Sequence, residues 1–515
     1  MIPSIPELRR SAKALKKSCI AGEAAAVARV KAVLPDAREV KYADALHVLA
    51  REAGFLSWPK LKLSVETAAL DRSQKQELLK IALFHGQNAR VAHLLDETPD
   101  LARGLLGLEI AVYDLAAVKA ALARDPKAAV TPRGPRRPIL HLAFSRYIHL
   151  RPDLATDVLE IAELLVEHGA DVNDVYLQDA DPNMPLSALY GALGHANNMG
   201  LARWLLDHGA NPNDGESLYH SVELGHHEGL SMLLDHGATP AGTNALPRAL
   251  DFNDHKAVEM LLVAGADPNE GIGPHPSGEP SFVIPCLHQA ARRMCDAAMI
   301  RLLLKAGADP SHRNQGVTPY AMARGYGNAD AARLIEQAQG DTMLSNGEAL
   351  LAAAADGDVP AGRFVDPLKL PEEFRNLIRN LVHLPTALPH IARLVAIGLE
   401  YDRPDAIGLP PVHVAGWEGL PETLAYVLAL KPDLGHVNGY GGTLLSTIIH
   451  GSENCPTRST RDHIGCARLV LEEGVSLPSD AIRLAGEPNM AAFLSEWGGR
   501  YPGQVVDCKV AARPE

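Results

Sequence analysis

Three stretches of the chain between residues 201 and 270 carry nearly the same phrase at even spacing. They read LARWLLDHGANPND, LSMLLDHGATPAG and VEMLLVAGADPNE, and their central glycines follow one another at 28-residue steps: Gly209, Gly237 and Gly265. Paired leucines followed by a glycine mark the end of an amphipathic helix, because glycine adopts the left-handed conformation without a Cβ penalty. The proline beyond Gly209 and Gly265 cannot continue the helix. A short period of this kind predicts small helix–turn–helix units that stack on one another.

Related phrases extend the pattern beyond these three copies. GADVN ends a helix at 169–173, GADPS does so at 307–311, and first helices open with PILHLA at 138–143 and VTPYAMARGYGN at 317–328. On these residues the chain resembles ankyrin-repeat proteins, whose repeat is close to 33 residues. The resemblance covers roughly 73–497 and implies an all-α solenoid of about eleven repeats. The segment GFLSWP at 54–59 also resembles the region before the repeats in bacterial proteins of this family.

The phrases predict five segments, of which the first is an N-terminal helical cap at 1–72. Two ankyrin-repeat blocks, at 73–340 and 372–498, flank an irregular junction at 341–371, and a loose tail occupies 499–515. In the cap, helical spacing continues from Ser11 to Pro35, and a second helix ends at Gly54, with Phe55 and Trp58 folding back on it. Extra residues at VYLQDADPNM (175–184) and GIGPHPSGEPSF (271–282) are expected to be loops inserted at the long turns.

The net charge of the chain limits the class of partner that it is expected to bind. The chain has 49 Lys/Arg against 62 Asp/Glu, a net charge of −13, which argues against broad nucleic-acid binding and favours a protein partner. The first 65 residues instead hold twelve basic and six acidic residues. Five of the basic residues crowd the first helix: Arg9, Arg10, Lys13, Lys16 and Lys17. A nucleic-acid-associated regulator that uses this segment is therefore one alternative function.

No sequence signature points to a metal, a cofactor or a membrane. The six cysteines form no CxxC pair, and no stretch of about 20 apolar residues occurs, so we expect a cytoplasmic protein, a monomer or weak oligomer, with export as an effector kept as an alternative. Motifs for phosphate loops, nucleophile elbows and zinc proteases are absent. We therefore expect no enzyme, and the alternative is a non-obvious site near 340–371. DADPN at 179–183 lacks the later glycine and glutamate of a calcium loop and is expected to be a surface turn.

Histidines are numerous, but most recur at fixed repeat positions. His168, His208 and His236 each precede a helix-ending glycine. Recurrence in register indicates a structural task, such as satisfying backbone groups at helix ends, rather than metal binding. The resemblance gives His141, His288 and His413 the place of the family's TPLH histidine, which hydrogen-bonds between hairpin and helix.

The resemblance also predicts the partner-binding residues. In ankyrin repeats the two residues that follow the Ala-Ala position of the first helix face the concave groove, and Tyr, Trp, Phe and Arg dominate interface energies. With one residue from a long turn added, the predicted exposed set is Arg146, Tyr176, Glu223, Phe252, Arg292, Arg293, Tyr326, Trp417 and Glu418. The predicted function is a protein–protein interaction scaffold or regulator whose groove and loop tips bind a partner protein.

Overall fold

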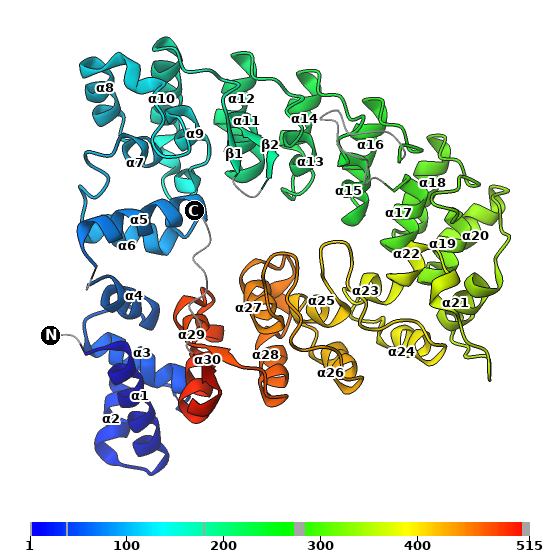
Figure 1. Ribbon diagram of the computed structural model, residues 1–515. Helices are drawn as coiled ribbons and strands as arrows, with labels where there is room; N and C mark the ends of the chain where they lie inside the picture. Colours follow the sequence, from blue (N-terminus) through cyan, green and yellow to red (C-terminus); the bar gives the residue numbers. More distant parts are fainter. Residues whose placement is uncertain (1–2, 38–39, 69, 179–180, 272–283, 507–515) are drawn as a thin grey trace. The chain divides into compact units, whose positions relative to one another are not determined.

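Helices make up nearly all of the secondary structure in the computed structural model (Figure 1). The structure describes residues 3–37, 40–68, 70–178, 181–271 and 284–506. Contacts divide the chain into unit 1, Met1–Ala238, and unit 2, Thr239–Glu515. The predicted boundary at 341–371 lies inside unit 2, so the two units do not coincide with the two predicted repeat blocks.

Unit 1 begins with four helices that precede the repeats: α1 (Ile5–Ile20), α2 (Ala24–Val33), α3 (Tyr42–Glu52) and α4 (Trp58–Ala68). The single helix predicted up to Pro35 is wrong, because the chain breaks at Gly22, whose φ is +77°. The break lets α2 fold back, so that Ala26 and Val30 pack with Ala12, Leu15 and residues of α3.

The α3–α4 connection confirms the predicted fold-back of the cap. Gly54 ends α3 with a φ of +87°. Phe55 and Trp58 then pack against the cluster of Leu8, Ala50 and Leu61, and Trp58 also contacts the neighbouring cluster built from α1, α2 and α3. A half-buried tryptophan therefore joins the two hydrophobic clusters of the cap.

Five helix pairs follow in unit 1. They are α5 (Arg72–Phe84) with α6 (Asn88–Glu97), α7 (Leu106–Ala111) with α8 (Leu115–Arg124), α9 (Pro138–Ala143) with α10 (Ala155–Glu167), α11 (Ala188–Tyr190) and the π-helical turn η4 (Gly191–His195) with α12 (Met199–Asp207), and α13 (Ser217–Ser221) with α14 (Glu228–Asp235). Short 3₁₀ turns are η1 (Pro126–Ala129), η2 (Arg146–His149) and η3 (Pro152–Leu154). First helices of successive pairs contact one another, as in α7 with α9 and α11 with α13.

The insertion at 175–184 is not a loop throughout. It forms β1 (Val175–Gln178) and β2 (Asp181–Ser187), an antiparallel pair in which Tyr176 lies opposite Leu186. Strand alternation turns Tyr176 inward and leaves Val175 and Leu177 exposed. The residues predicted to form a surface turn, 179–183, lie partly outside the described residues.

Unit 2 continues the pairs. They are α15 (Ala245–Asp251) with α16 (His255–Val263), α17 (Cys286–Arg292) with α18 (Ala297–Lys305), α19 (Pro319–Tyr326) with α20 (Ala329–Gln337), α23 (Leu377–Leu381) with α24 (Leu388–Ala396), α25 (Pro411–Trp417) with α26 (Pro421–Ala429), α27 (Leu444–Asn454) with α28 (His463–Glu472), and α29 (Ser479–Leu484) with α30 (Pro488–Arg500). The inserted residues 272–283 lie outside the described residues.

Between α20 and α23 the pairing is interrupted. α21 (Asn346–Asp356) packs against α19, the first helix of the preceding pair, and no second helix follows it directly in this described stretch. The chain instead passes through η5 (Pro367–Lys369) and the short α22 (Glu372–Arg375) before α23. The predicted junction at 341–371 therefore contains α21 and η5, and its place as a boundary between two repeat blocks stays a prediction.

The C-terminal segment is more ordered than the loose tail predicted from 499. α30 continues to Arg500, and η7 (Pro502–Gln504) leads to β4 (Val505–Val506), which pairs parallel with β3 (Leu477–Pro478). Gln504 accepts a hydrogen bond from Trp497 and donates to the carbonyls of Leu471 and Val475. These bonds attach residues up to 506 to α28 and α30, and 507–515 lie outside the described residues.

Helix ends in the repeats are closed by three recurring devices. Gly209 and Gly265 adopt φ of +90° and +93°. In the preceding position, Nδ1 of His168, His208 and His236 lies 2.7–2.8 Å from the carbonyl four residues earlier, which confirms a structural role for these histidines. Beyond the glycine, Asn269 donates to Gly307 O (2.9 Å) of the next repeat.

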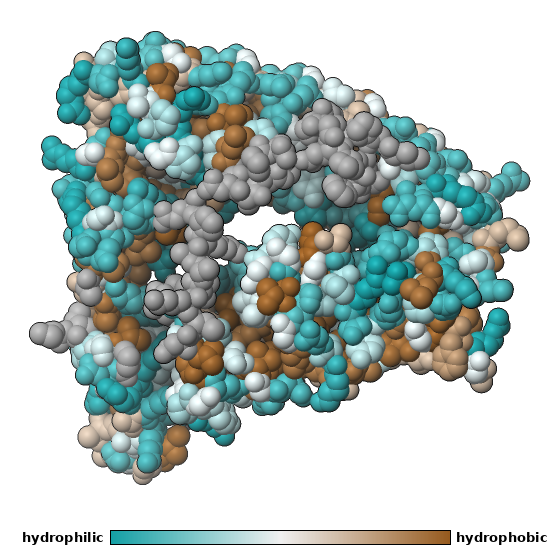
Figure 2. Space-filling model, in the orientation of Figure 1, coloured by the Kyte–Doolittle hydropathy of each residue, from teal (hydrophilic) through white to brown (hydrophobic). Residues whose placement is uncertain are grey.

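The second helices show the surface expected of a stacked repeat. Each buries an apolar stripe, such as Leu205 and Leu261, against its neighbours. In unit 1 the outer edge over α12 and α14 is mostly hydrophilic (Figure 2). Among the described residues, no helix combines the length and apolar character needed to cross a lipid bilayer.

Candidate functional site

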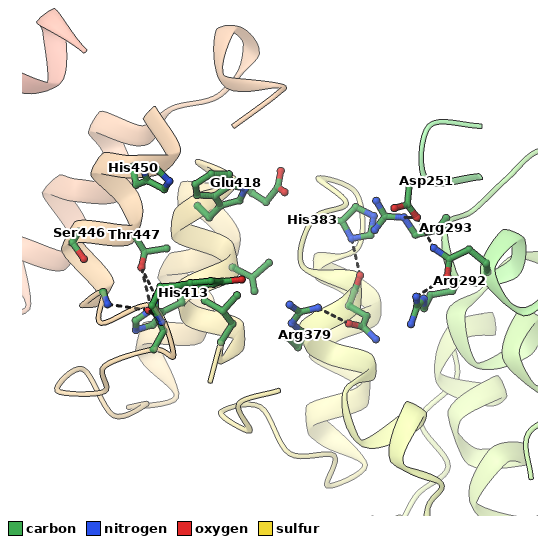
Figure 3. A pocket seen from close by; sticks show the side chains of 18 residues that line it. Asp251, Arg292, Arg293, Arg379, His383, His413, Glu418, Ser446, Thr447 and His450 are labelled. Atoms are coloured by element: carbon green, nitrogen blue, oxygen red, sulfur yellow. Dashed lines mark hydrogen bonds and ion pairs between the residues drawn. The ribbon is translucent and has the colours of Figure 1, made fainter. Parts of the chain in front are cut away.

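A pocket of about 720 Å³ lies within unit 2, between the first helices of several repeats (Figure 3). Its first wall comes from α15, α17 and α23 and its second wall from α25 and α27. Because the first helices of successive repeats line the groove of a solenoid, the pocket is a local deepening of that groove. Its volume falls in the range of about 300–1,000 Å³ common for ligand sites.

The first wall is built around one aspartate. Asp251 ends α15 and accepts a hydrogen bond from Gln289 (2.5 Å) of α17. Its carboxylate also forms ion pairs with Arg248 (2.7 Å), one turn earlier, and with Arg293 (3.0 Å), just after α17. The single carboxylate of Asp251 therefore forms ion pairs with two guanidinium groups.

α23 supplies the middle of the pocket, and its residues are held from behind by α19 and α22. Asn380 donates to Oη of Tyr326 (2.8 Å), and that hydroxyl donates to Glu373 (2.6 Å). Glu373 is also 3.4 Å from Arg292, and Arg379 pairs with Asp405 at 2.6 Å. These contacts fix the polar groups of the first wall in place.

The second wall is aromatic and apolar in part. Trp417 ends α25, and its ring centroid lies 5.2 Å from that of His450 on α27. Glu418 follows and lies 3.8 Å from Arg461. Tyr440, at the turn before α27, is 68% exposed and lines the outer part of the pocket.

Burial keeps two pocket histidines neutral near pH 7. It lowers the pKa of His383 to about 4, with help from the charge of Arg293, and lowers the pKa of His413 to about 4, with help from His436. Burial raises the pKa of Glu418, an effect that Arg461 and Arg293 oppose. The arginines are therefore the main fixed positive charges of the pocket.

Four of the predicted partner-binding residues meet in this pocket: Arg292, Arg293, Trp417 and Glu418. Phe252 follows Asp251 and is 47% exposed, with the guanidinium of Arg248 at 4.9 Å from its ring. The structure thus places one cluster of the predicted set together, and its part in partner binding stays a prediction.

Two predicted residues are not exposed, and the expectation for them is corrected. Tyr326 is 1% exposed because α21 and α23 cover it and Glu373 and Asn380 bind its hydroxyl. Tyr176 is 9% exposed because the pleat of β1 turns it inward, where its hydroxyl accepts a hydrogen bond from Arg136. Both residues support other side chains instead of facing solvent.

Arg146 and Glu223 occupy groove-side positions of unit 1, but both make contacts within the chain. Arg146 is partly buried and donates through Nε to the carbonyl of His195 (2.9 Å). Glu223 lies 2.6 Å from Nδ1 of His220. Neither side chain lines the unit 2 pocket.

Sequence reasoning missed several lining residues: Arg379, His383, Tyr440 and His450. The repeat that contains α23 lacks the first-helix phrase from which the groove positions were mapped, so its residues had no register. His450 lies one helical turn beyond Thr447 on α27, and no motif in the sequence marked either residue.

Some residues of the two segments behind the alternative functions, the basic N-terminal segment and 341–371, have structural roles. In the basic N-terminal segment, Arg9 is partly buried, and burial lowers its pKa, whereas Arg10, Lys13 and Lys17 are exposed on α1. In 341–371, Glu348 accepts a hydrogen bond from the Ser345 amide at the start of α21.

Two of the TPLH-position histidines make the expected backbone contact. Nε2 of His141 lies 3.0 Å from Arg133 O, and Nε2 of His288 lies 2.9 Å from Val317 O. His413 instead approaches Thr447 Oγ1 at 3.2 Å through Nδ1. The described residues contain no group of three or more side chains arranged to hold a metal ion.

Comparison with known proteins gives one family-model match, which covers part of the chain. The ankyrin repeat model matches residues 285–315. An ankyrin repeat domain from Acinetobacter baumannii AYE is 23% identical, with a TM-score of 0.30, and the match covers 38% of this chain and 99% of that domain. The human ASB11 ankyrin repeat domain is 16% identical, with a TM-score of 0.24, over 49% of this chain and 96% of that domain. No curated protein matches the chain.

Proposed function

Because this chain is an ankyrin-repeat protein, and ankyrin repeats generally mediate protein–protein interaction, we propose that it is a binding scaffold or regulator whose partner protein docks in the groove of unit 2. The observation that carries the proposal is the pocket, where Arg292, Arg293, Trp417 and Glu418 converge from two walls. Tryptophan and arginine are the residue types that most often dominate interface energies.

The pocket suits a protruding part of a partner better than a flat surface. A standard interface buries about 800 Å² per partner, and its strongest contacts sit in desolvated hollows near the centre. The pocket provides such a hollow, and the exposed side chains of Phe252 and Tyr440, 47% and 68% accessible, extend the contact surface beyond it.

The pocket also requires little rearrangement on binding. Asp251, Glu373 and Asp405 hold the arginines of the first wall in ion pairs, and Tyr326 fixes Asn380 from behind. Side chains that are ordered before binding lose less entropy when a partner arrives. This supports a preformed binding surface in place of one assembled by the partner.

Affinity capture from the native cell lysate tests the proposal. Wild type is compared with a pocket variant that carries Arg292→Glu, Arg293→Glu and Trp417→Ala. The matched control carries Arg301→Glu and Lys305→Glu, two exposed residues of α18 in the same unit. We expect a protein that wild type and the control retain and the pocket variant loses. Equal recovery by all three would place binding elsewhere, and no recovery by any would contradict a stable scaffold.

A further inference from the structure

Charge pairing around the pocket leaves one guanidinium without a carboxylate of its own. Arg292 pairs with Glu373, Arg379 with Asp405, and Glu418 is matched by Arg461. The remaining group is Arg293, which must share Asp251 with Arg248 and with the amide of Gln289. The side chains that line the pocket comprise three arginines and two carboxylates, an excess of one positive charge, in a chain whose net charge is −13.

The geometry of Arg293 makes that charge available. Its Nε lies 3.0 Å from Asp251 Oδ1, but the alignment is too poor for a hydrogen bond, and this buried nitrogen has no other acceptor among the described residues. The side chain is 29% exposed and lines the pocket beside the ring of His383 (Figure 3). A guanidinium in this state can offer a fork of N–H donors to an incoming planar acceptor.

Apart from the shared carboxylate of Asp251, the groups that face Arg293 are neutral or are paired with another arginine. His383 and His413 are neutral near pH 7, because burial lowers their pKa values to about 4. Glu418, across the pocket, is engaged by Arg461. The second wall offers an uncharged surface, where the rings of Trp417 and His450 contact each other at a tilt and Leu409 and Val414 add apolar atoms.

We infer that the pocket takes an acidic side chain from an extended peptide segment of the partner, with Arg293 binding the carboxylate and the Trp417–His450 pair contacting an adjacent apolar residue. This inference rests on the proposed function, since it names the chemistry recognised by the same pocket. The −13 net charge disfavours acidic partners in general, so a single surplus arginine in a hollow would select by local fit more than by long-range attraction.

Peptide selection on the full chain tests the inference. A displayed library of random dodecapeptides is selected on wild type, on Arg293→Gln and on the control Arg301→Gln, which removes an exposed arginine of α18. We expect wild type and the control to enrich sequences with Asp or Glu beside an apolar residue, and Arg293→Gln to lose that enrichment. Enrichment without acidic residues, unaffected by Arg293→Gln, would overturn the inference while leaving a groove-binding function intact. No enrichment on wild type would count against both.

A double-mutant cycle with one selected peptide then measures the contact itself. Arg293→Gln and a Glu→Gln change in the peptide are each expected to weaken binding about 30-fold, and the two changes together little more than either alone. Arg293→Lys should restore part of the affinity, which separates loss of the charge from misfolding. Versions with a free and an amidated C-terminus identify which carboxylate is bound. Independent, additive losses, or a loss only on amidation, would contradict an acidic side chain as the ligand.

Discussion

The groove-side positions of the two units are used differently. In unit 1 they are occupied by contacts of the chain with itself. The guanidinium of Arg136 lies 4.3–4.8 Å from the ring centroids of Phe84, Phe144 and Tyr176, and His195 packs on the first of these rings at 4.2 Å. In unit 2 the corresponding first helices surround a pocket of about 720 Å³.

The difference shows that the same positions of a repeat can either be filled by contacts that stabilise the solenoid or leave a pocket open. In unit 1, the guanidinium of Arg136 in the 133–136 hairpin contacts three aromatic rings. These rings come from α5, from the residue that follows α9, and from β1. In unit 2, the second wall presents Trp417 and Tyr440 with no arginine of the chain stacked on them among the described residues, and Arg293 shares its carboxylate. Residue type at a groove position is therefore insufficient to predict function, since the neighbouring repeats decide what remains free.

The largest effect is expected at the aromatic cluster of unit 1. Arg136→Ala removes contacts with three rings and the hydrogen bond to Tyr176, and should lower the free energy of unfolding by about 3 kcal/mol. Urea unfolding followed by circular dichroism measures it. Arg133→Ala, an exposed arginine of the same hairpin, serves as the control. Equal midpoints for the two variants would mean that the cluster contributes nothing specific to stability.

Substitution of Trp417, in contrast to that of Arg136, should affect partner binding more than stability. Trp417→Ala removes a half-buried ring from the pocket and should weaken partner binding by about 2 kcal/mol, with a smaller loss of stability. Calorimetric titration with the captured partner and thermal unfolding give the two numbers. A stability loss larger than the affinity loss would make Trp417 a packing residue and would remove the contrast between the two units.

A charged histidine provides a third comparison within unit 1. Burial alone would lower the pKa of His220, but hydrogen bonds and attraction from Glu216 and Glu223 together raise it to about 9. A raised pKa favours the folded state most below the unfolded value near 6.5, and this contribution is lost as the pH rises through about 9. The ring of Tyr190 also faces that of His220, with the two centroids 4.9 Å apart and the planes tilted.

The measurement is the urea midpoint of wild type relative to His220→Gln between pH 6.5 and 9.5. The stabilisation of wild type over the variant should be on the order of 1–2 kcal/mol at the acidic end and should shrink toward the alkaline end. Other titrating groups cancel in the difference. A constant difference across this range would show that His220 is not held in its charged form.

The smallest effects should be equal in the two units, because both use the same inter-repeat link. Asn173 donates to Gly209 O and accepts from the Asn211 amide, and Asn269 donates to Gly307 O and accepts from the Asp309 amide. Substitution of either asparagine by alanine should lower the free energy of unfolding by about 1 kcal/mol. A clearly larger loss in one unit would show that the stacking itself, and not only the groove, differs between them.

Local features of the sequence were sufficient to predict the repeat architecture. Leucine pairs, helix-ending glycines and the following prolines act within one or two turns, so Gly209 and Gly265 and the apolar stripes could be identified from spacing alone. The in-register histidines were also interpreted correctly, since His168, His208 and His236 each bind a carbonyl only four residues away. The helix break at Gly22 was missed because the apolar spacing continues across it.

Only the tertiary structure decided which groove residues are free. Tyr326 and Trp417 end their helices at similar repeat positions, yet one is 1% exposed beneath α21 and α23 and the other lines a pocket. The partners that bury Tyr326 come from residues 373–380, in a repeat that lacks the regular phrase. Local sequence determined the repeat fold because helix ends depend on neighbouring residues, whereas the pocket depends on how separate repeats pack, with lining residues that range from Asp251 to His450.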